Sequence, residues 1–330
     1  MTVTANELER LKELLRGRVL ILCHHNADPD AVCAAYGVSD LAKALDPSVD
    51  AVIVLPGGAS RLSRAVMEEL GIEASDALSL DGADAIVVVD TATLNQLEEL
   101  GEAVASAVVP KVFIDHHAPH QTVAAIATCH IVDESASSTC EIIHNLYEGF
   151  GVTPPPDVAR ALLVGIAYDS RHFSLGTSQT LRSASKLLEI EGPLEGILSM
   201  LVSDSSRSEK IARLKAAQRM ELHDVHGWAI AVSRLSSFQA SAARALIRLG
   251  ADVSIVAGKD KKELRASLRA TDRFYRETGV HLGGDVAQIL GKEFRGAGSG
   301  HPTAAGVNCR GDLDALLKRA VGVISSNLKE

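Results

Sequence analysis

The chain has 330 residues, of which 46% are hydrophobic and 23% are charged, and its formal net charge is -9 at pH 7. This length fits two domains, and the composition excludes a disordered, collagen-like or disulfide-scaffold protein. The negative charge argues against sequence-independent binding to duplex DNA, which depends on many Lys and Arg contacts to phosphate groups.

The beginning of the chain, residues 1–18, has the pattern of a charged amphipathic helix rather than of a signal peptide. No apolar run reaches the roughly 18 residues that a membrane-spanning helix needs. The five cysteines are odd in number and form no C-x-x-C pair, so we expect reduced thiols rather than disulfides or a cysteine zinc site. We therefore expect a cytoplasmic protein without a membrane partner.

Apolar runs in the first half of the chain predict strands buried on both faces of a parallel sheet. Four of them lead to an Asp or a His, at residues 19–23, 85–89, 111–114 and 162–167, and a fifth at residues 51–55 does not. Helical patterns lie between and around them, at residues 31–44, 62–70, 94–107, 138–150 and 156–164. This alternation predicts an α/β domain with a doubly wound, mostly parallel sheet.

A second, smaller α/β domain is predicted after a helical region that ends near residue 201. A polar stretch covers residues 203–208, a helix covers 209–222, and a charged turn covers 259–262. Strands are expected at 228–232, 253–257 and 264–270, helices at 237–249 and from 313, and Gly-rich turns at 283–284 and 296–300. We therefore divide the chain into a first domain at 1–200, a linker helix at 201–224 and a second domain at 225–330.

Polar residues beyond the four apolar runs nominate a functional site. In open α/β sheets ligands bind beyond the carboxyl ends of the strands, so these residues are expected to converge on one crevice. They are His24, Asp28, Asp30, Asp90, Asp115, His116, His117 and Asp169. An Asp after a strand can also be a plain helix N-cap, so the nomination depends on all four positions together.

The number of acids in this group predicts bound cations. Five or more carboxyl and imidazole groups packed together without counter-charge would repel one another and lose hydration. Oxygen ligands with some imidazole and no thiolate suit Mn²⁺ or Mg²⁺, with Co²⁺ or Zn²⁺ as alternatives.

Four motifs, in this order, resemble those of the DHH phosphoesterase superfamily. They are His-x-x-x-Asp-x-Asp at residues 24–30, the single Asp90, Asp-His-His at residues 115–117, and Asp-Ser-Arg-His-Phe from Asp169. Residues 298–306, Gly-Ser-Gly-His-Pro-Thr-Ala-Ala-Gly, resemble the glycine-rich GGGH-x-x-AAG signature of the DHH-associated C-terminal domain. The resemblance covers nearly the whole chain, and the active site is expected in a cleft between the two domains.

The resemblance implies a role for each matching residue. His24, Asp28 and Asp90 would hold one metal ion, and Asp30, Asp90, His116 and Asp169 would hold a second, with Asp90 bridging the pair. His117 would face the scissile phosphate as a hydrogen-bond donor or proton carrier, and Asp115 would orient a neighbouring imidazole. The residues expected to bind the substrate are His117, Arg171, Arg269, Gly298, Ser299, Gly300 and His301.

The mechanism implied by two neighbouring Mn²⁺ ions is attack of an activated water molecule on phosphorus, without a protein nucleophile. Three positions depart from the family pattern. Cys33 and Ala34 stand where many relatives have Gly-Ser, and Ser299 replaces the middle glycine of the C-terminal signature. Because these side chains are small, we expect an altered fit to the substrate and an intact metal site.

Short nucleotides are the expected substrates and partners: oligoribonucleotides of a few residues, dinucleotides such as pApA or cyclic di-AMP, or 3′-phosphoadenosine 5′-phosphate. A homodimer is kept as an option. A RecJ-like single-strand exonuclease is the first alternative, but such enzymes use basic grooves and aromatic stacking, and only 3% of these residues are aromatic. An inorganic pyrophosphatase, which lacks the glycine-rich signature, and a nucleotide sensor without turnover are further alternatives.

Overall fold

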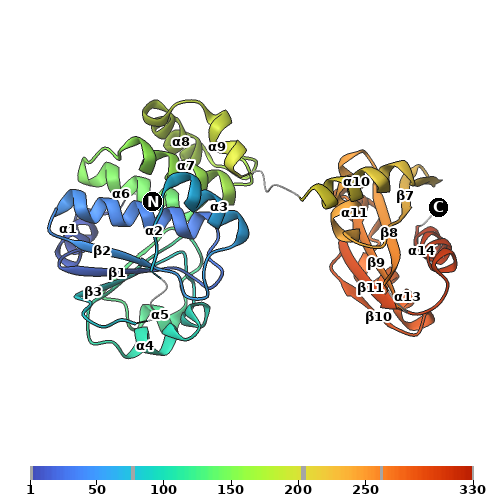
Figure 1. Cartoon of the computed structure of the whole chain (residues 1–330), viewed down its shortest axis with the longest axis horizontal. Helices are drawn as coiled ribbons and strands as arrows, with labels where there is room; N and C mark the ends of the chain where they lie inside the picture. Colours follow the sequence, from blue (N-terminus) through green and yellow to red (C-terminus); the bar gives the residue numbers. More distant parts are fainter. Residues whose placement is uncertain (1–2, 76–78, 202–205, 261–262, 329–330) are drawn as a thin grey trace. The chain divides into compact units, whose positions relative to one another are not determined.

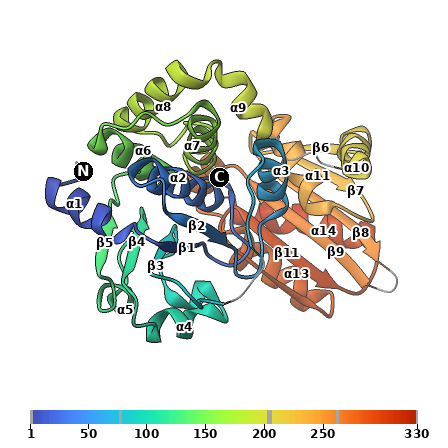
Figure 2. The ribbon, with the colours of Figure 1, turned by 60° about the vertical axis from the view of Figure 1, so that its left-hand side comes forward.

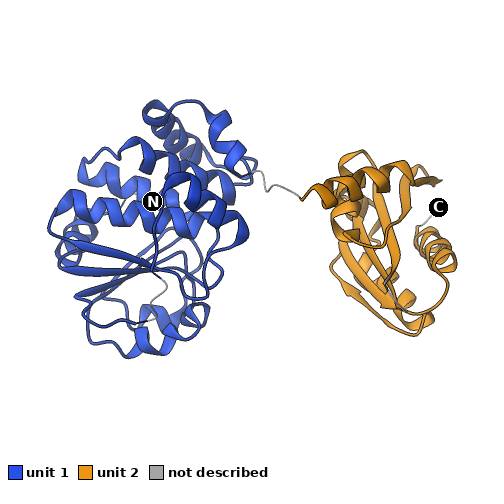
Figure 3. Ribbon diagram, in the orientation of Figure 1, with its two compact units in different colours: residues 1–203 blue, residues 204–330 orange. Residues whose placement is uncertain are grey.

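The computed structural model of the chain describes residues 3–75, 79–201, 206–260 and 263–328 (Figure 1). The chain forms two compact units, residues 1–203 (unit 1) and residues 204–330 (unit 2), shown in Figure 3. The helix α10 (Arg207–Gln218) and the strand β6 (Glu221–Val225), which occupy the expected linker, lie within unit 2. Parts of the expected polar stretch (203–205) and charged turn (261–262) lie outside the described residues. The cleft between the domains stays a prediction.

Unit 1 is built on a five-stranded parallel sheet with the order β2-β1-β3-β4-β5. Its strands are β1 (Arg18–Leu22), β2 (Asp50–Val54), β3 (Ala85–Val89), β4 (Lys111–Asp115) and β5 (Cys129–Val132). The strands β3 and β4 are buried along their whole length, as expected of central parallel strands whose two faces are both covered. The predicted α/β class and doubly wound sheet are confirmed.

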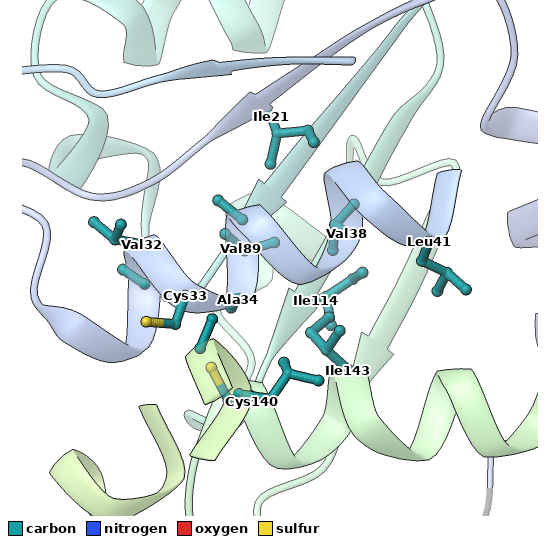
Figure 4. Packing of buried hydrophobic residues seen from close by; sticks show 14 of the residues in the cluster. Ile21, Val32, Cys33, Ala34, Val38, Leu41, Val89, Ile114, Cys140 and Ile143 are labelled. Carbon is teal, nitrogen blue, oxygen red and sulfur yellow. The ribbon is translucent and has the colours of Figure 1, made fainter. Parts of the chain in front are cut away.

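Helices cover both faces of this sheet (Figure 1). One layer contains α1 (Ala5–Leu14), α2 (Pro29–Leu45), α3 (Arg61–Leu70), α6 (Thr139–Phe150), α7 (Pro156–Asp169), α8 (Ser178–Glu191) and α9 (Leu194–Met200). The other contains η1 (Leu94–Leu97), α4 (Leu100–Ser106) and α5 (Gln121–Ala124). Alternate residues of β1 enter the two cores, Ile21 the first and Leu20 the second. Figure 4 shows Val38 of α2 and Ile143 of α6 in the first core, near Ile114 of the sheet.

The prediction of a strand at residues 162–167 is wrong, because this run belongs to the helix α7. The helix is enclosed by α2, α6 and α8, so nearly every residue from Val158 to Ala167 is buried (Figure 2). An enclosed helix has no polar face, and its apolar run therefore lacks the 3.6-residue period that distinguishes helix from strand. The fifth strand of the sheet is β5, which the sequence reading missed.

Unit 2 contains a six-stranded mixed sheet with the order β10-β11-β9-β8-β7-β6, in which only β7 and β8 pair in parallel. Besides β6 its strands are β7 (Trp228–Arg234), β8 (Val253–Asp260), β9 (Glu263–Ala270), β10 (Ala297–Gly300) and β11 (Ala304–Cys309). Its helices besides α10 are α11 (Gln239–Arg248), α12 (Asp272–Thr278), η2 (Leu282–Ala287), α13 (Gln288–Glu293) and α14 (Leu313–Asn327). The smaller second α/β domain is confirmed.

Two details of unit 2 correct the sequence reading. The helix expected at residues 209–222 ends at Gln218, and the residues after it form the edge strand β6. The Gly-rich segment expected as a turn at residues 296–300 forms the strand β10, and residues 283–284 lie in the π-helix η2. Within the described part of the chain, no helix has the length and apolar composition that a membrane crossing requires.

Candidate functional site

The carboxyl edge of the unit 1 sheet carries most of the nominated side chains. His24 follows β1, Asp90 follows β3, and Asp115 is the last residue of β4. The three strands are neighbours in the order β1-β3-β4, so their ends bring these residues together. His116 and His117 extend the end of β4. Convergence therefore involves three strands and not the four that the sequence suggested.

The turn from β1 into α2 supplies two more acids. Asp28 is the N-cap of α2 and accepts a hydrogen bond from the Ala31 backbone N–H at 3.1 Å. Asp30 lies in the first turn of the same helix, directly after Pro29. The partial positive charge of the helix N-terminus stabilises both carboxylates. The N-cap role of Asp28 therefore coexists with its place in the site.

Asp169 reaches the site from the last turn of α7 and not from a strand. Close packing of α7 depends on Gly165, since a Cβ atom there would lie 2.2 Å from Cys140 Sγ and 2.7 Å from Asp30 Oδ1. Any larger residue would press on Asp30 or on α6. Gly165 was not predicted as part of the site; its only signal in the sequence is a glycine inside an otherwise apolar run.

The six residues expected as ligands form two adjacent groups that could each hold a metal ion: His24, Asp28 and Asp90, and Asp30, His116 and Asp169. A third such cluster, Asp90, Asp115, His116 and His117, overlaps both. Within each group, one ligand atom per residue lies within 4.8 Å of the others. Asp90 stands between the groups, with Oδ2 3.8 Å from His24 Nε2 and Oδ1 3.6 Å from His116 Nε2. The structure therefore brings together all six residues expected as metal ligands.

Asp90 is held in a defined orientation. Its backbone is left-handed, with φ 52°, a conformation that Asp tolerates better than most residues, and its N–H donates to the Ile114 carbonyl at 3.0 Å. The Thr139 hydroxyl donates to Asp90 Oδ1 at 2.9 Å. The side chain is 3% exposed. Neither Thr139 nor the backbone conformation could be recognised from a motif.

Asp30 is completely buried and is anchored at the start of α6. Its Oδ2 accepts a hydrogen bond from the Thr139 backbone N–H at 2.7 Å, and its Oδ1 accepts one from the Cys140 N–H at 3.0 Å. Each carboxylate oxygen keeps a second lone pair. Asp30 can therefore bind a cation without giving up these hydrogen bonds.

The carboxylates lie where negative charge is unfavourable in the absence of a cation. Burial, Asp90 and Asp169 raise the pKa of Asp30 well above its usual range, and burial and Asp28 raise the pKa of Asp90 to about 6. Burial alone would lower the pKa of His24, but Asp28, the His25 carbonyl and Asp90 raise it to about 9. Neighbouring acids and imidazoles thus compensate one another only in part.

The imidazoles present nitrogen atoms to this negative site. His24 Nδ1 lies 2.8 Å from the His25 carbonyl oxygen. When Nδ1 carries the proton and donates to this oxygen, the lone pair of Nε2 is available to the site. His116 Nε2 is buried without a hydrogen bond of acceptable geometry, although Asp169 Oδ2 is 3.1 Å away. A buried nitrogen without a hydrogen bond, facing carboxylates, is the arrangement expected of a metal ligand, so this donor set fits divalent cations.

His117 and Asp115 form a pair beside the metal-ligand groups. Asp115 Oδ1 lies 2.8 Å from His117 Nδ1 and also accepts a hydrogen bond from the His117 backbone N–H at 3.0 Å. Asp115 raises the pKa of His117, and the imidazole is 52% exposed. The imidazole of His117 is therefore accessible beside these groups, and Asp115 fixes its orientation.

Arg171 lies in a tight turn directly after Asp169. Arg171, His172 and Phe173 all have left-handed backbones, with φ of 50°, 57° and 65°. Such a conformation costs about 1–2 kcal/mol for each residue with a side chain. The turn is closed by the Ser170 hydroxyl, which accepts a hydrogen bond from the Phe173 N–H at 3.0 Å. Arg171 is exposed at this strained turn.

The other expected substrate-binding residues lie in unit 2, around β9, β10 and β11. Arg269 is opposite Ala304, Ser267 is opposite Gly306, and Gly306 is opposite Ser299, so these residues share one face of the sheet. The Arg269 guanidinium donates to the Leu268 carbonyl at 2.7 Å. We call the exposed part of this face, formed by Ser267, Arg269, Ser299, Ala304 and Gly306, the unit 2 face.

The glycines of the C-terminal signature have different structural roles. A Cβ atom at Gly298 would lie 1.9 Å from the Ala287 carbonyl oxygen, and one at Gly300 would lie 2.3 Å from that of Ala304. These two glycines therefore permit close backbone packing. For a Cβ atom at Gly306 the nearest atom would be 3.9 Å away, so the missing side chain leaves open space opposite Ser267. His301 is exposed just beyond β10.

Comparison with known proteins adds independent information. The model of the DHH family, N-terminal domain, matches residues 18–166. An uncharacterised protein of Methanocaldococcus jannaschii is 36% identical over 314 residues, covering 95% of this chain and 94% of the relative. A bifunctional oligoribonuclease and PAP phosphatase of Thermus thermophilus is 26% identical, covering 95% and 91%. The crystal structure of an exopolyphosphatase-related protein from Bacteroides fragilis has the same fold, with a TM-score of 0.62, 17% identity and coverage of 98% and 96%.

Proposed function

This chain belongs to the DHH family of phosphoester hydrolases, and we propose that it hydrolyses phosphoester bonds of short nucleotides with two divalent cations bound at the carboxyl edge of the unit 1 sheet. The observation that carries the proposal is the position of Asp90. One buried carboxylate directs Oδ2 toward His24 and Oδ1 toward His116, at 3.8 Å and 3.6 Å. Such a carboxylate is placed to join two metal ions.

The ligand sets follow from this arrangement. His24, Asp28 and Asp90 would hold the first cation, and Asp30, Asp90, His116 and Asp169 the second. Mn²⁺ is our first candidate, with Mg²⁺ or Co²⁺ as substitutes, because oxygen and imidazole ligands without thiolate suit these ions. Two divalent cations bound there would supply the acidity that activates a water molecule for attack on phosphorus and the positive charge that stabilises the phosphoryl oxygens.

The protein's own residues complete the reaction. As water oxygen bonds to phosphorus, the bond from phosphorus to the leaving ester oxygen breaks, and that oxygen needs a proton. His117 is half-exposed, and Asp115 holds its Nδ1 at 2.8 Å, so Nε2 remains for donation to the leaving oxygen. The buried side chains of Asp30 and Asp90 stay fixed through the start of α6, which avoids reorganisation during the reaction.

The choice of short nucleotides is supported by unit 2 and by the Thermus relative, which acts on oligoribonucleotides and PAP and aligns over 95% of this chain. Arg269 would bind a phosphate group, and the space at Gly306 would admit a base or a ribose. The unit 2 face offers small side chains and no aromatic ring for base stacking. A long single strand, the substrate of a RecJ-like exonuclease, is therefore less suited to it.

The test is a substrate panel with purified protein and Mn²⁺. It contains pApA, a 5-mer RNA, cyclic di-AMP, 3′-phosphoadenosine 5′-phosphate, pyrophosphate and long single-stranded DNA. Asp90→Asn removes the bridging carboxylate. Asp40→Asn is a matched control, because Asp40 accepts a hydrogen bond from Tyr147 in the helical layer outside the site.

We expect turnover of at least one short nucleotide, lost in Asp90→Asn and retained in Asp40→Asn. Cleavage of pyrophosphate alone, or degradation of long DNA in preference to every short substrate, would contradict the proposed substrate class. Tight nucleotide binding without turnover of any compound would make the protein a sensor and would contradict the proposal as a whole.

A further inference from the structure

We infer that Thr139 is a positioning residue that makes Asp90 divide its two oxygens between the two metal-ligand groups, an inference that rests on the proposed function. Thr139 is the first residue of α6 and is completely buried. Its hydroxyl donates to Asp90 Oδ1 at 2.9 Å, and its backbone N–H donates to Asp30 Oδ2 at 2.7 Å. One residue therefore holds two of the predicted metal ligands.

The hydroxyl acts on the degree of freedom that decides whether Asp90 can bridge. Rotation about the terminal torsion of an Asp side chain is broad and is not confined to sharp rotamers. If the carboxylate turned, Oδ1 would no longer face His116 while Oδ2 faces His24, as they do at 3.6 Å and 3.8 Å. The backbone of Asp90 fixes the position of the side chain, and the hydrogen bond from Thr139 fixes the rotation of its carboxylate about the terminal torsion.

Thr139 itself is held by groups outside the site. Ser138 is the N-cap of α6, and its hydroxyl accepts a hydrogen bond from the Glu141 N–H at 3.1 Å. Glu141 is 1% exposed and accepts hydrogen bonds from Ser137 and from the Thr180 hydroxyl, at 2.8 Å and 2.9 Å. The first turn of α6 is thus fixed by its own network. The contacts in this network involve no predicted metal ligand.

The side chain and the backbone of Thr139 have separable effects, which makes the inference testable. Thr139→Val keeps the branched shape and the backbone N–H to Asp30 but removes the hydroxyl. Thr139→Ser keeps the hydroxyl, and Thr139→Ala removes it at nearly the same size as serine. The Val–Thr and Ala–Ser pairs therefore test the same hydroxyl twice, so the question can be answered even when one variant does not fold.

Tyr147→Phe is the matched control. Tyr147 is also fully buried in α6, and its hydroxyl also donates to a carboxylate, but to Asp40 and not to a predicted ligand. A general loss of a buried hydrogen bond would affect Tyr147→Phe in the same way as Thr139→Val. A specific effect on the metal-ligand groups would not.

The experiment titrates Mn²⁺ into chelated protein by calorimetry and records the electron paramagnetic resonance spectrum of the loaded protein, in which two bridged Mn²⁺ ions are magnetically coupled. We expect Thr139→Val and Thr139→Ala to bind the weaker Mn²⁺ roughly 10–100-fold less tightly, the loss typical of removing a group that orients a ligand, and to lose the coupling. Thr139→Ser and Tyr147→Phe should resemble the wild type. Hydrolysis should follow the same order, through kcat more than KM.

Two results would overturn the inference: wild-type affinity and coupling in Thr139→Val or Thr139→Ala, or an equal loss in Tyr147→Phe. If the wild-type protein binds fewer than two Mn²⁺ ions, the two-cation site of the proposed function is contradicted, and not the role of Thr139. The two failures are therefore distinguishable from the same titration.

Discussion

The metal-ligand groups of unit 1 and the unit 2 face are built in opposite ways. In unit 1, Asp30 and Asp90 are buried, and each is held by hydrogen bonding to the start of α6. In unit 2 the residues of the face are half-buried or exposed and, apart from Arg269, small, and Arg269 donates to the Leu268 and Ala305 backbone carbonyls. Reaction chemistry needs charges fixed before the substrate arrives, whereas substrate choice needs space and a few polar contacts.

Chelating the metal should have the largest effect on hydrolysis. The proposed reaction depends on the cations, and the metal-ligand groups that hold them lie in unit 1. We expect hydrolysis to be abolished and restored by Mn²⁺. Each bound Mn²⁺ at about 100 times its Kd should stabilise the protein by about 2.7 kcal/mol. For a unit of this size that corresponds to a rise in Tm of about 5–10 °C. Calorimetry with EDTA and with Mn²⁺ measures the stabilisation and the change in Tm. An unchanged Tm would contradict cation binding.

The same measurement has a defined pH dependence. In the metal-free protein, burial raises the pKa of Asp90 to about 6, above the value of about 4 for an unfolded chain. The folded state then binds this proton more tightly than the unfolded state, so its contribution to stability is present below about pH 4 and is lost as the pH rises through 6. The increase in Tm caused by Mn²⁺ should therefore be larger at pH 7.5 than at pH 5.

Gly165→Ala should give the next largest effect, because a Cβ atom there would overlap Asp30 and Cys140. We expect a loss of about 1–3 kcal/mol in the free energy of unfolding from overpacking, together with weaker Mn²⁺ binding. Gly196→Ala, on α9 with no atom within 4 Å of the added Cβ, is the control. Denaturant unfolding and Mn²⁺ titration measure the two losses. Wild-type values for both would show that the site tolerates movement of α7.

Arg269→Met should act differently, since it removes a charge from the unit 2 face. Hydrogen bonds to charged groups contribute about 1.5–3 kcal/mol, so we expect KM to rise roughly 10–100-fold while Mn²⁺ binding stays unchanged. Arg248→Met, at the exposed end of α11, controls for the lost charge. If kcat falls and KM does not change, Arg269 is not a ground-state contact and the comparison between the two regions is wrong.

Gly306→Val should have the smallest effect. The open space at this position accommodates the new side chain, so the Tm should stay near that of the wild type while KM rises about tenfold through loss of room for the substrate. Gly322→Val, on α14 in equally open surroundings, is the control. An unchanged KM for every short nucleotide would show that the substrate does not approach β11.

The sequence predicted the parts of the fold whose pattern is local. The runs at residues 19–23, 85–89 and 111–114 became the neighbouring strands β1, β3 and β4, because central parallel strands are apolar throughout. It failed at residues 162–167, where enclosure by other helices removed the polar face that identifies a helix. Short strands such as β5 and β10 were missed because four residues carry too little pattern.

For the site, the sequence by itself determined the chemistry: which acids and imidazoles are present, in which order, and that such a set calls for cations. Tertiary structure alone decided how they are arranged. Thr139 holds Asp90 across a sequence separation of 49 residues, and Gly165 lets α7 approach Asp30. Neither residue has a distinctive local pattern, because each acts through packing between elements that are distant in the chain. A motif records ligands, whereas the orientation of those ligands depends on how the helices pack against them.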